Sequence, residues 1–102
     1  MVALQNDEPV GIGAFFIMEN KTEVEIKRMY VPPAHRGKGI SKLVLQELEN
    51  WARDKKIPYA KLETGDKNVT AISLYKKAEY LRIDLYEPYL ERADSLCFGK
   101  KL

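Results

Sequence analysis

Residues 23–30 alternate with a period of two, whereas residues 9–18 form a nearly continuous apolar run, and both patterns are typical of β-strands. The sequence predicts a short strand at Val2–Gln5, a longer strand over residues 9–18 and another over residues 23–30. Polar turns at residues 6–8 and 19–22 separate them. Gly11 and Gly13 interrupt the second strand and indicate a bulge or a close backbone neighbour. We therefore expect two long antiparallel strands joined by a hairpin.

Beyond residue 40 the apolar positions recur every three or four residues, which predicts an amphipathic helix. Its expected inward face consists of Ile40, Leu43, Val44, Leu48, Trp51 and Ala52. A buried strand is expected over residues 59–64, and Asn68 can cap a second helix. The expected inward positions of that helix are Val69, Ile72, Tyr75 and Ala78. Residues 80–86 and 95–100 are strand candidates on either side of a loop that holds Pro88.

This order of elements predicts an α+β (mixed α/β) fold. An antiparallel hairpin is followed by a strand-helix-strand-helix unit and by closing antiparallel strands. The 102 residues fit one domain, residues 1–102, with a modest core. Hydrophobic residues make up 45% and charged residues 31%, as in ordinary globular proteins. No apolar run approaches the roughly 18 residues of a membrane span and no signal peptide is visible, so we expect a cytoplasmic protein without a membrane partner.

Charge and cysteine content narrow the classes of function. A net charge of +2 is too small to indicate a nucleic-acid partner. A basic interaction domain for RNA or DNA would rest on a local cluster alone, and it ranks last among the hypotheses; the cluster comprises Lys27, Arg28, His35, Arg36 and Lys38. One cysteine excludes an internal disulfide, and a single histidine with a single cysteine forms no zinc-site spacing, so no metal is expected.

The stretch Arg36-Gly37-Lys38-Gly39-Ile40-Ser41 lies between a predicted strand and the first turn of a helix. Backbone N–H groups at a helix start favour an anion, and glycines allow a positive φ and a close approach of the main chain. Two cations add to this, so the turn suggests a pyrophosphate site. A plain solvent-exposed turn is the alternative. The stretch matches neither a Walker loop nor a dinucleotide fingerprint.

The same stretch resembles the Arg/Gln-x-x-Gly-x-Gly/Ala signature of the GNAT superfamily of acetyl-CoA-dependent N-acetyltransferases. Arg36, Gly39 and Ser41 fall on its defined positions, and Ser41 departs from the usual final Gly or Ala. Serine is small and its hydroxyl can donate to phosphate. The segments "EIKRMYVPPAHRGKGI", "LETGDKNVTAISLYKKAEYLRI" and "SLCFGKKL" are similar to successive parts of the family core. The resemblance covers nearly everything after residue 9.

The resemblance implies a central sheet in which two neighbouring strands splay apart and admit the pantetheine arm of acetyl-CoA, the expected co-substrate. Met29, Tyr30 and Val31 match the strand positions that bond this arm. The pyrophosphate would lie on the turn, made of Arg36, Gly37, Lys38, Gly39, Ile40 and Ser41. Asn68 matches a position that contacts the arm, although it can equally be an ordinary helix cap.

Three side chains are candidates for catalysis. Tyr75 matches a helix tyrosine that would protonate the departing thiolate as a general acid, and its alternative role is a core aromatic. Glu25 is the first candidate for the base; a regular pleat would put it on the same face as Lys27 and Met29, and its alternative role is a solvated carboxylate. Glu63 is the second candidate, as base or as a ligand of the acceptor ammonium.

The reaction expected from these groups is direct attack of a primary amine, of a small molecule or a protein, on the thioester in a ternary complex. An acetyl-enzyme is not expected, because Cys97 has no histidine nearby in sequence and fits a small buried hydrophobe. A non-catalytic acyl-CoA-binding module is the alternative. GNAT domains usually carry a further strand and two helices before the hairpin. We therefore expect an uncovered strand edge near Val2–Gln5 or residues 9–18, and a homodimer that uses it.

Overall fold

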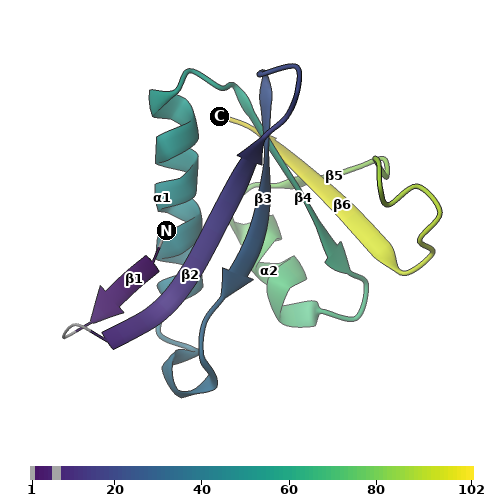
Figure 1. Cartoon of the computed structure of the whole chain (residues 1–102). Helices are drawn as coiled ribbons and strands as arrows, with labels where there is room; N and C mark the ends of the chain where they lie inside the picture. Colours follow the sequence, from purple (N-terminus) through teal and green to yellow (C-terminus); the bar gives the residue numbers. More distant parts are fainter. Residues whose placement is uncertain (1, 6–7) are drawn as a thin grey trace.

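The computed structural model describes residues 2–5 and 8–102. It contains a six-stranded mixed sheet in the order β1-β2-β3-β4-β6-β5 and two α-helices (Figure 1). The elements are β1 Val2–Gln5, β2 Glu8–Ile17, β3 Glu23–Tyr30, the 3-10 helix η1 Pro33–His35, α1 Ile40–Asp54, β4 Tyr59–Gly65, α2 Val69–Lys77, β5 Leu81–Ile83 and β6 Ser95–Lys101. The expected α+β class is confirmed.

Four strands differ in their bounds from the expectation, and of these β4 and β6 each end one residue later than expected. β2 begins and ends one residue earlier than expected. The strand expected over residues 80–86 is shorter, because only Leu81–Ile83 pairs with β6. The chain then leaves the sheet as a loop, residues 84–94, before it returns as β6. Aromatic side chains of this loop contact the sheet, as described below.

The sheet opens between β3 and β4. These strands are parallel, and their pairing runs only from Glu23 with Tyr59 to Glu25 with Lys61. Beyond that point β3 continues along β2, whereas β4 continues along β6, so the two strand ends diverge (Figure 1). The splayed sheet that the sequence resemblance implied is therefore present. At the sheet edge, β1 pairs with β2 alone, as expected for an uncovered strand.

A β-bulge changes the direction of side chains in β3. Ile12 pairs with Tyr30 and Ala14 pairs with Lys27, so β3 holds one residue more than β2 over this interval. Arg28 absorbs the extra residue with a φ of 57°. As a result Met29 packs on the helix-covered face. The expectation that Glu25 and Met29 share a face was wrong, because the pleat is not regular here.

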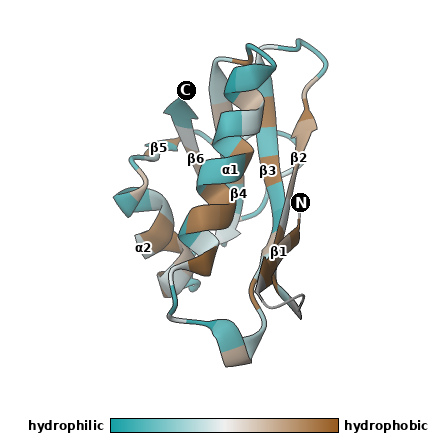
Figure 2. Ribbon diagram, turned by 90° about the vertical axis from the view of Figure 1, so that its left-hand side faces the viewer, coloured by the Kyte–Doolittle hydropathy of each residue, from teal (hydrophilic) through white to brown (hydrophobic). Residues whose placement is uncertain are grey.

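Both helices lie on one face of the sheet and share its core (Figures 1 and 2). The buried residues of this core come from β3, α1, β4, α2 and β6; they include Val24, Ile26, Val44, Leu45, Leu48, Ala52, Leu62, Tyr75 and Phe98. Gly11 and Gly13 of β2 let α1 approach closely, since a Cβ on Gly13 would lie 2.6 Å from Val44 Cγ1. The expected close neighbour of these glycines is thus α1.

The buried stripe of α1 is rotated from the expected one. Leu43 is 60% exposed and Trp51 is 47% exposed, whereas Leu45 and Glu49 are buried. The helix packs against the sheet and also faces α2. The residues of α1 that face α2, such as Leu45 and Glu49, are therefore covered. Val69 of α2 is exposed as well, because it opens that helix at the protein surface. Within the described residues, no helix is long and apolar enough to cross a membrane.

Candidate active site

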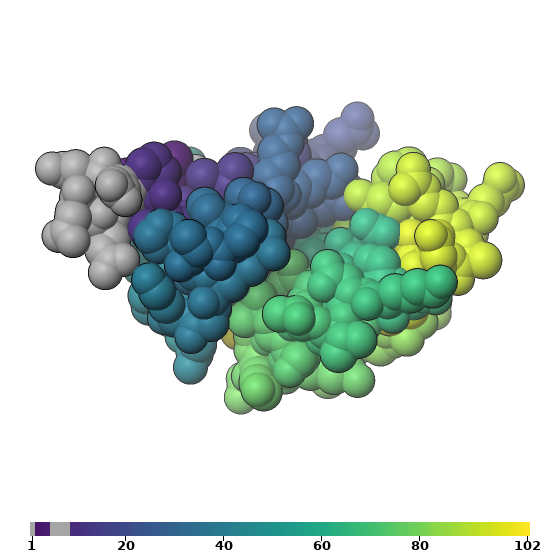
Figure 3. Space-filling view, turned by 90° about the horizontal axis from the view of Figure 1, so that it is seen from below, coloured from purple at the N-terminus to yellow at the C-terminus, as the bar shows by residue number. Residues whose placement is uncertain are grey.

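The diverging ends of β3 and β4 border a cleft of about 740 Å³. Figure 3 views this side, where the blue segment around the glycine turn and the green α2 flank a hollow. The cleft is lined by residues 26–31 of β3 and its end, by His35, Arg36, Gly37, Gly39, Ile40, Ser41 and Lys42, by Glu63 and Thr64 of β4, and by Asn68, Thr70, Ala71, Leu74 and Tyr75. Four elements of the fold therefore converge on one opening.

The glycine turn has the backbone geometry that an anion site requires. Gly37 has a φ of 80° and Gly39 a φ of 77°, a region that side-chain-bearing residues rarely adopt. A Cβ at either position would meet nothing within 4 Å, so the main chain is open to a ligand. α1 begins directly afterwards at Ile40, and the first N–H groups of a helix lack intrahelical acceptors. The turn therefore fits a pyrophosphate group.

Arg36 ties this turn to the end of β3. Its Nε donates a hydrogen bond of 2.9 Å to the carbonyl oxygen of Val31, and its guanidinium lies 5.7 Å from the centre of the Tyr30 ring. These contacts fix the path of the chain between strand and helix. Beside them, the buried Nδ1 atom of His35 has no hydrogen-bond partner among the described residues.

Two residues of the α2 segment line the cleft with different environments. Asn68 caps the helix, since its Oδ1 accepts a hydrogen bond of 3.2 Å from the N–H of Ala71. Tyr75 is 7% exposed and lies against the rings of Tyr80 and Phe98, at centroid distances of 5.9 and 6.3 Å. Burial raises the pKa of Tyr75. Its phenol is therefore protonated at neutral pH and can donate a proton or a hydrogen bond.

The two candidate carboxylates lie in different places. Glu63 is half-buried, lines the cleft and accepts a short hydrogen bond of 2.6 Å from Ser95 Oγ. Glu25 does not line the cleft. It is 7% exposed and accepts a hydrogen bond of 2.8 Å from the hydroxyl of Tyr86, with Lys27 Nζ at 3.5 Å. The structure thus brings Glu63, but not Glu25, to the same opening as Tyr75.

Of the expected cofactor-binding residues, all except Lys38 line this cleft. Lys38 lies in the glycine turn and is exposed. Ser95 and Tyr86, which hold the two carboxylates, were not predicted from the sequence. Tyr86 lies in the β5–β6 loop and Ser95 follows it at the start of β6. Nothing in the local sequence pattern of this segment indicates which strands its side chains contact. In the described part of the chain, no group of three or more His, Cys, Asp or Glu side chains could hold a metal ion.

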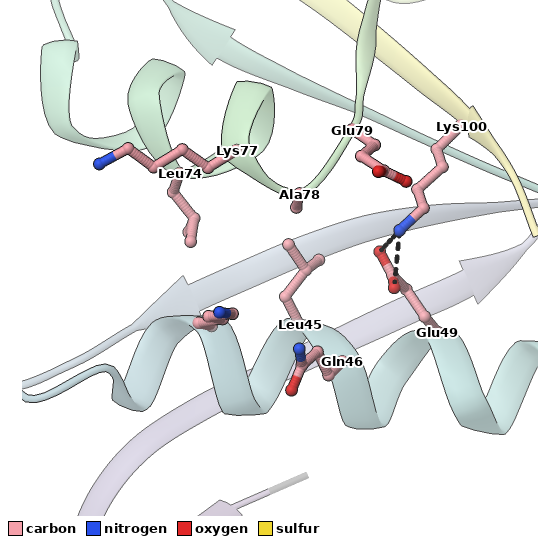
Figure 4. A pocket seen from close by; sticks show the side chains of 9 residues that line it. Leu45, Gln46, Glu49, Leu74, Lys77, Ala78, Glu79 and Lys100 are labelled. Atoms are coloured by element: carbon pink, nitrogen blue, oxygen red, sulfur yellow. Dashed lines mark hydrogen bonds and ion pairs between the residues drawn. The ribbon is translucent and has the colours of Figure 1, made fainter.

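A smaller cavity of about 300 Å³ lies between α1 and α2 (Figure 4). It shares Lys42 and Leu74 with the cleft. At its side the buried Glu49 accepts hydrogen bonds from Lys100 Nζ at 3.1 and 3.2 Å and from the Tyr80 hydroxyl at 2.9 Å. These bonds join α1 to β6 and to the connection between α2 and β5. Glu49 therefore has a structural role that explains its burial on a helix face expected to be polar.

The chain matches the model of the acetyltransferase (GNAT) family over residues 1–80. It is also 35% identical to an IAA acetyltransferase of Azospirillum brasilense over 102 residues, which cover the whole chain and 67% of that relative. The splayed sheet, the glycine turn before a helix and these sequence matches all indicate the same family. The chain belongs to the GNAT acetyltransferase family.

Solved structures show the same fold. A Klebsiella pneumoniae protein described as an acyl-CoA N-acyltransferase superimposes with a TM-score of 0.87 and 34% identity, over 93% of this chain and 65% of that one. A PaiA N-acetyltransferase of Thermoplasma acidophilum in complex with coenzyme A superimposes with a TM-score of 0.85 and 24% identity, over 99% of this chain and 58% of that one. The chain thus spans about two thirds of the length of its first relatives.

Proposed function

We propose that the protein transfers an acetyl group from acetyl-CoA to a primary amine by direct attack in a ternary complex. The observation that carries this proposal is the cleft itself, in which an anion-binding turn, diverging strand ends, a protonated tyrosine and a carboxylate share one opening. Membership of an acetyltransferase family supports the reaction class. The acetyl group and the order of steps belong to the proposal.

The binding roles follow from the geometry of the cleft. The N–H groups of the turn from Arg36 to Ser41 would hold the pyrophosphate of acetyl-CoA, helped by the dipole of α1. Met29, Tyr30 and Val31 lie beyond the point where β3 stops pairing with β4. Their main-chain groups can therefore bond the pantetheine arm. Asn68 would contact this arm from the opposite side while it caps α2.

The proton transfers involve two side chains. A primary ammonium has no lone pair, so it must lose a proton before its nitrogen attacks the thioester carbonyl. We propose that Glu63 accepts this proton, because Glu63 lines the cleft. Glu25 does not line it and is bonded to Tyr86 and Lys27 instead. As the new C–N bond forms and the C–S bond breaks, Tyr75 gives its phenolic proton to the departing thiolate. The attacking nitrogen then loses its second proton to solvent, and solvent returns a proton to the Tyr75 phenolate.

The experiment is a thiol-release assay with acetyl-CoA and a panel of small primary amines and lysine peptides. Release above the hydrolysis background supports the transfer reaction. Binding of acetyl-CoA without any release would favour the non-catalytic module instead. A parallel comparison of Glu63→Gln with Glu25→Gln tests the assignment of the base. The assignment predicts a loss of about 100-fold in the first variant only.

We also propose that two copies of the chain associate through β1. This strand forms an edge of the sheet and carries Val2 and Leu4, which are 55% and 61% exposed. An exposed strand edge offers unpaired main-chain groups to another strand. Sedimentation of a monomer at micromolar concentration would contradict this. A single domain of residues 1–102 and a cytoplasmic location remain predictions.

A further inference from the structure

Ser95 and Glu63 form a short hydrogen bond across two paired strands. Ser95 is the first residue of β6 and is 5% exposed, and its Oγ lies 2.6 Å from Glu63 Oε2. The pairing of Gly65 with Ser95 and of Glu63 with Cys97 fixes both main chains. The hydroxyl therefore donates from a rigid position to a carboxylate that lines the cleft.

The start of β6 is anchored on both sides. The N–H of Ser95 donates to the carbonyl of Arg92 at 3.2 Å, and the N–H of Asp66 donates to the carbonyl of Asp94 at 2.8 Å. Such anchoring leaves the Ser95 side chain little freedom to follow the carboxylate. If Glu63 rotates, the hydrogen bond breaks, so the bond restrains the rotamer of Glu63.

We propose that Ser95 is the positioning residue of the catalytic base: its hydroxyl holds one oxygen of Glu63 and leaves the other directed at the acceptor amine. This inference rests on the proposed function, in which Glu63 removes the proton.

Other charged and titratable groups lie near Glu63 on this part of the sheet, and the variants described below leave most of them unchanged. Lys61 shares the strand of Glu63, and Glu25 and Lys27 come from β3. Tyr86 and Tyr89 project from the β5–β6 loop, and the buried Cys97 lies opposite Glu63 on β6. A substitution of Ser95 leaves all of these side chains in place.

The chain supplies a matched control in the second carboxylate. The Tyr86 hydroxyl donates to Glu25 Oε2 at 2.8 Å, so Tyr86→Phe removes the same kind of bond from a carboxylate that does not line the cleft. Ser95→Ala and Tyr86→Phe therefore each remove one hydroxyl donor. Only the first should alter the base that the proposed function uses.

The experiment measures kcat and KM for an accepted amine in the wild type, Ser95→Ala, Ser95→Thr and Tyr86→Phe. We expect Ser95→Ala to lower kcat about 10- to 100-fold, because the base is no longer held in place. KM should change little, because Ser95 does not line the cleft. Ser95→Thr keeps a hydroxyl and should restore the wild-type kcat, and Tyr86→Phe should keep the wild-type kcat.

Thermal unfolding and the Kd for acetyl-CoA identify variants that are merely misfolded. If Ser95→Ala does not fold, Ser95→Cys replaces it, because a thiol is a weaker donor of similar size and should also lower kcat. An unchanged kcat in a folded Ser95→Ala or Ser95→Cys, with normal wild-type turnover, would overturn this inference alone. A loss of kcat in Tyr86→Phe instead would assign the base to Glu25. Failure of the wild type to turn over any amine would refute the proposed function and this inference with it.

Discussion

Replacement of Gly13 by alanine tests the packing of α1 on β2. The new methyl would lie 2.6 Å from Val44 Cγ1, 2.9 Å from Met29 Sδ and 3.0 Å from Leu48 Cδ1. Apolar atoms pack best at about 3.5–4.0 Å, so these contacts are short by about 0.5–1.4 Å. Either α1 moves away from the sheet or the three side chains leave their preferred rotamers.

The expected cost follows from two opposing effects. Overpacking of a core costs about 1–3 kcal/mol, and replacing glycine in a strand returns about 0.5–1 kcal/mol. The net loss in the free energy of unfolding should therefore be about 1–2 kcal/mol. For a domain of this size that corresponds to a fall in Tm of about 5–15 °C.

Calorimetric or circular-dichroism melting of Gly13→Ala checks this value, with Gly65→Ala as the matched control. Gly65 also lies in a strand, but a Cβ there would meet nothing within 4 Å. Gly65→Ala should be as stable as the wild type or more stable by up to about 1 kcal/mol. Equal melting temperatures for the two variants would refute the reasoning that Gly13 is required by close approach of α1.

Two further predictions concern tyrosines. Tyr75→Phe should lower kcat about 100-fold or more, because the general acid is lost, while the Kd for acetyl-CoA in calorimetric titration stays unchanged; a wild-type kcat would exclude this role. Tyr80 has a pKa raised by burial and by Glu49, so its contribution to stability is complete below its ordinary value of 10.0 and is lost as pH rises beyond it. Denaturant titrations should therefore show that the decline in unfolding free energy above pH 10 is less steep in Tyr80→Phe, by about 1.4 kcal/mol per pH unit. Parallel declines would contradict it.

The fold could be predicted from the sequence where local pattern and long-range structure agree. The alternating residues of β3, the periodic residues of α1 and the two glycines of the turn each specify their element directly. The splayed strands followed from the family resemblance, because no local pattern indicates where two parallel strands stop pairing. The end of β5 was missed since its length depends on its partner β6.

The candidate site was predictable in its backbone and less so in its side chains. The positive φ values of Gly37 and Gly39 follow from their residue type. The environments of Glu25 and Glu63 do not, because their partners, Tyr86 and Ser95, are distant in sequence. Burial of Glu49 likewise depends on Lys100, which is distant in sequence.

The most direct test of the central claim is calorimetric titration of acetyl-CoA into the wild type and into Gly39→Glu. Gly39 has a φ of 77° at the start of α1, so a glutamate there adds backbone strain and a negative charge at the proposed pyrophosphate site. Asn50→Glu adds the same charge near the other end of α1 and is the control.

The account predicts binding to the wild type and to Asn50→Glu, and a loss of at least about tenfold in affinity in a folded Gly39→Glu, or about 1.4 kcal/mol. Equal affinity in all three proteins would contradict the claim that the glycine turn holds the pyrophosphate of acetyl-CoA.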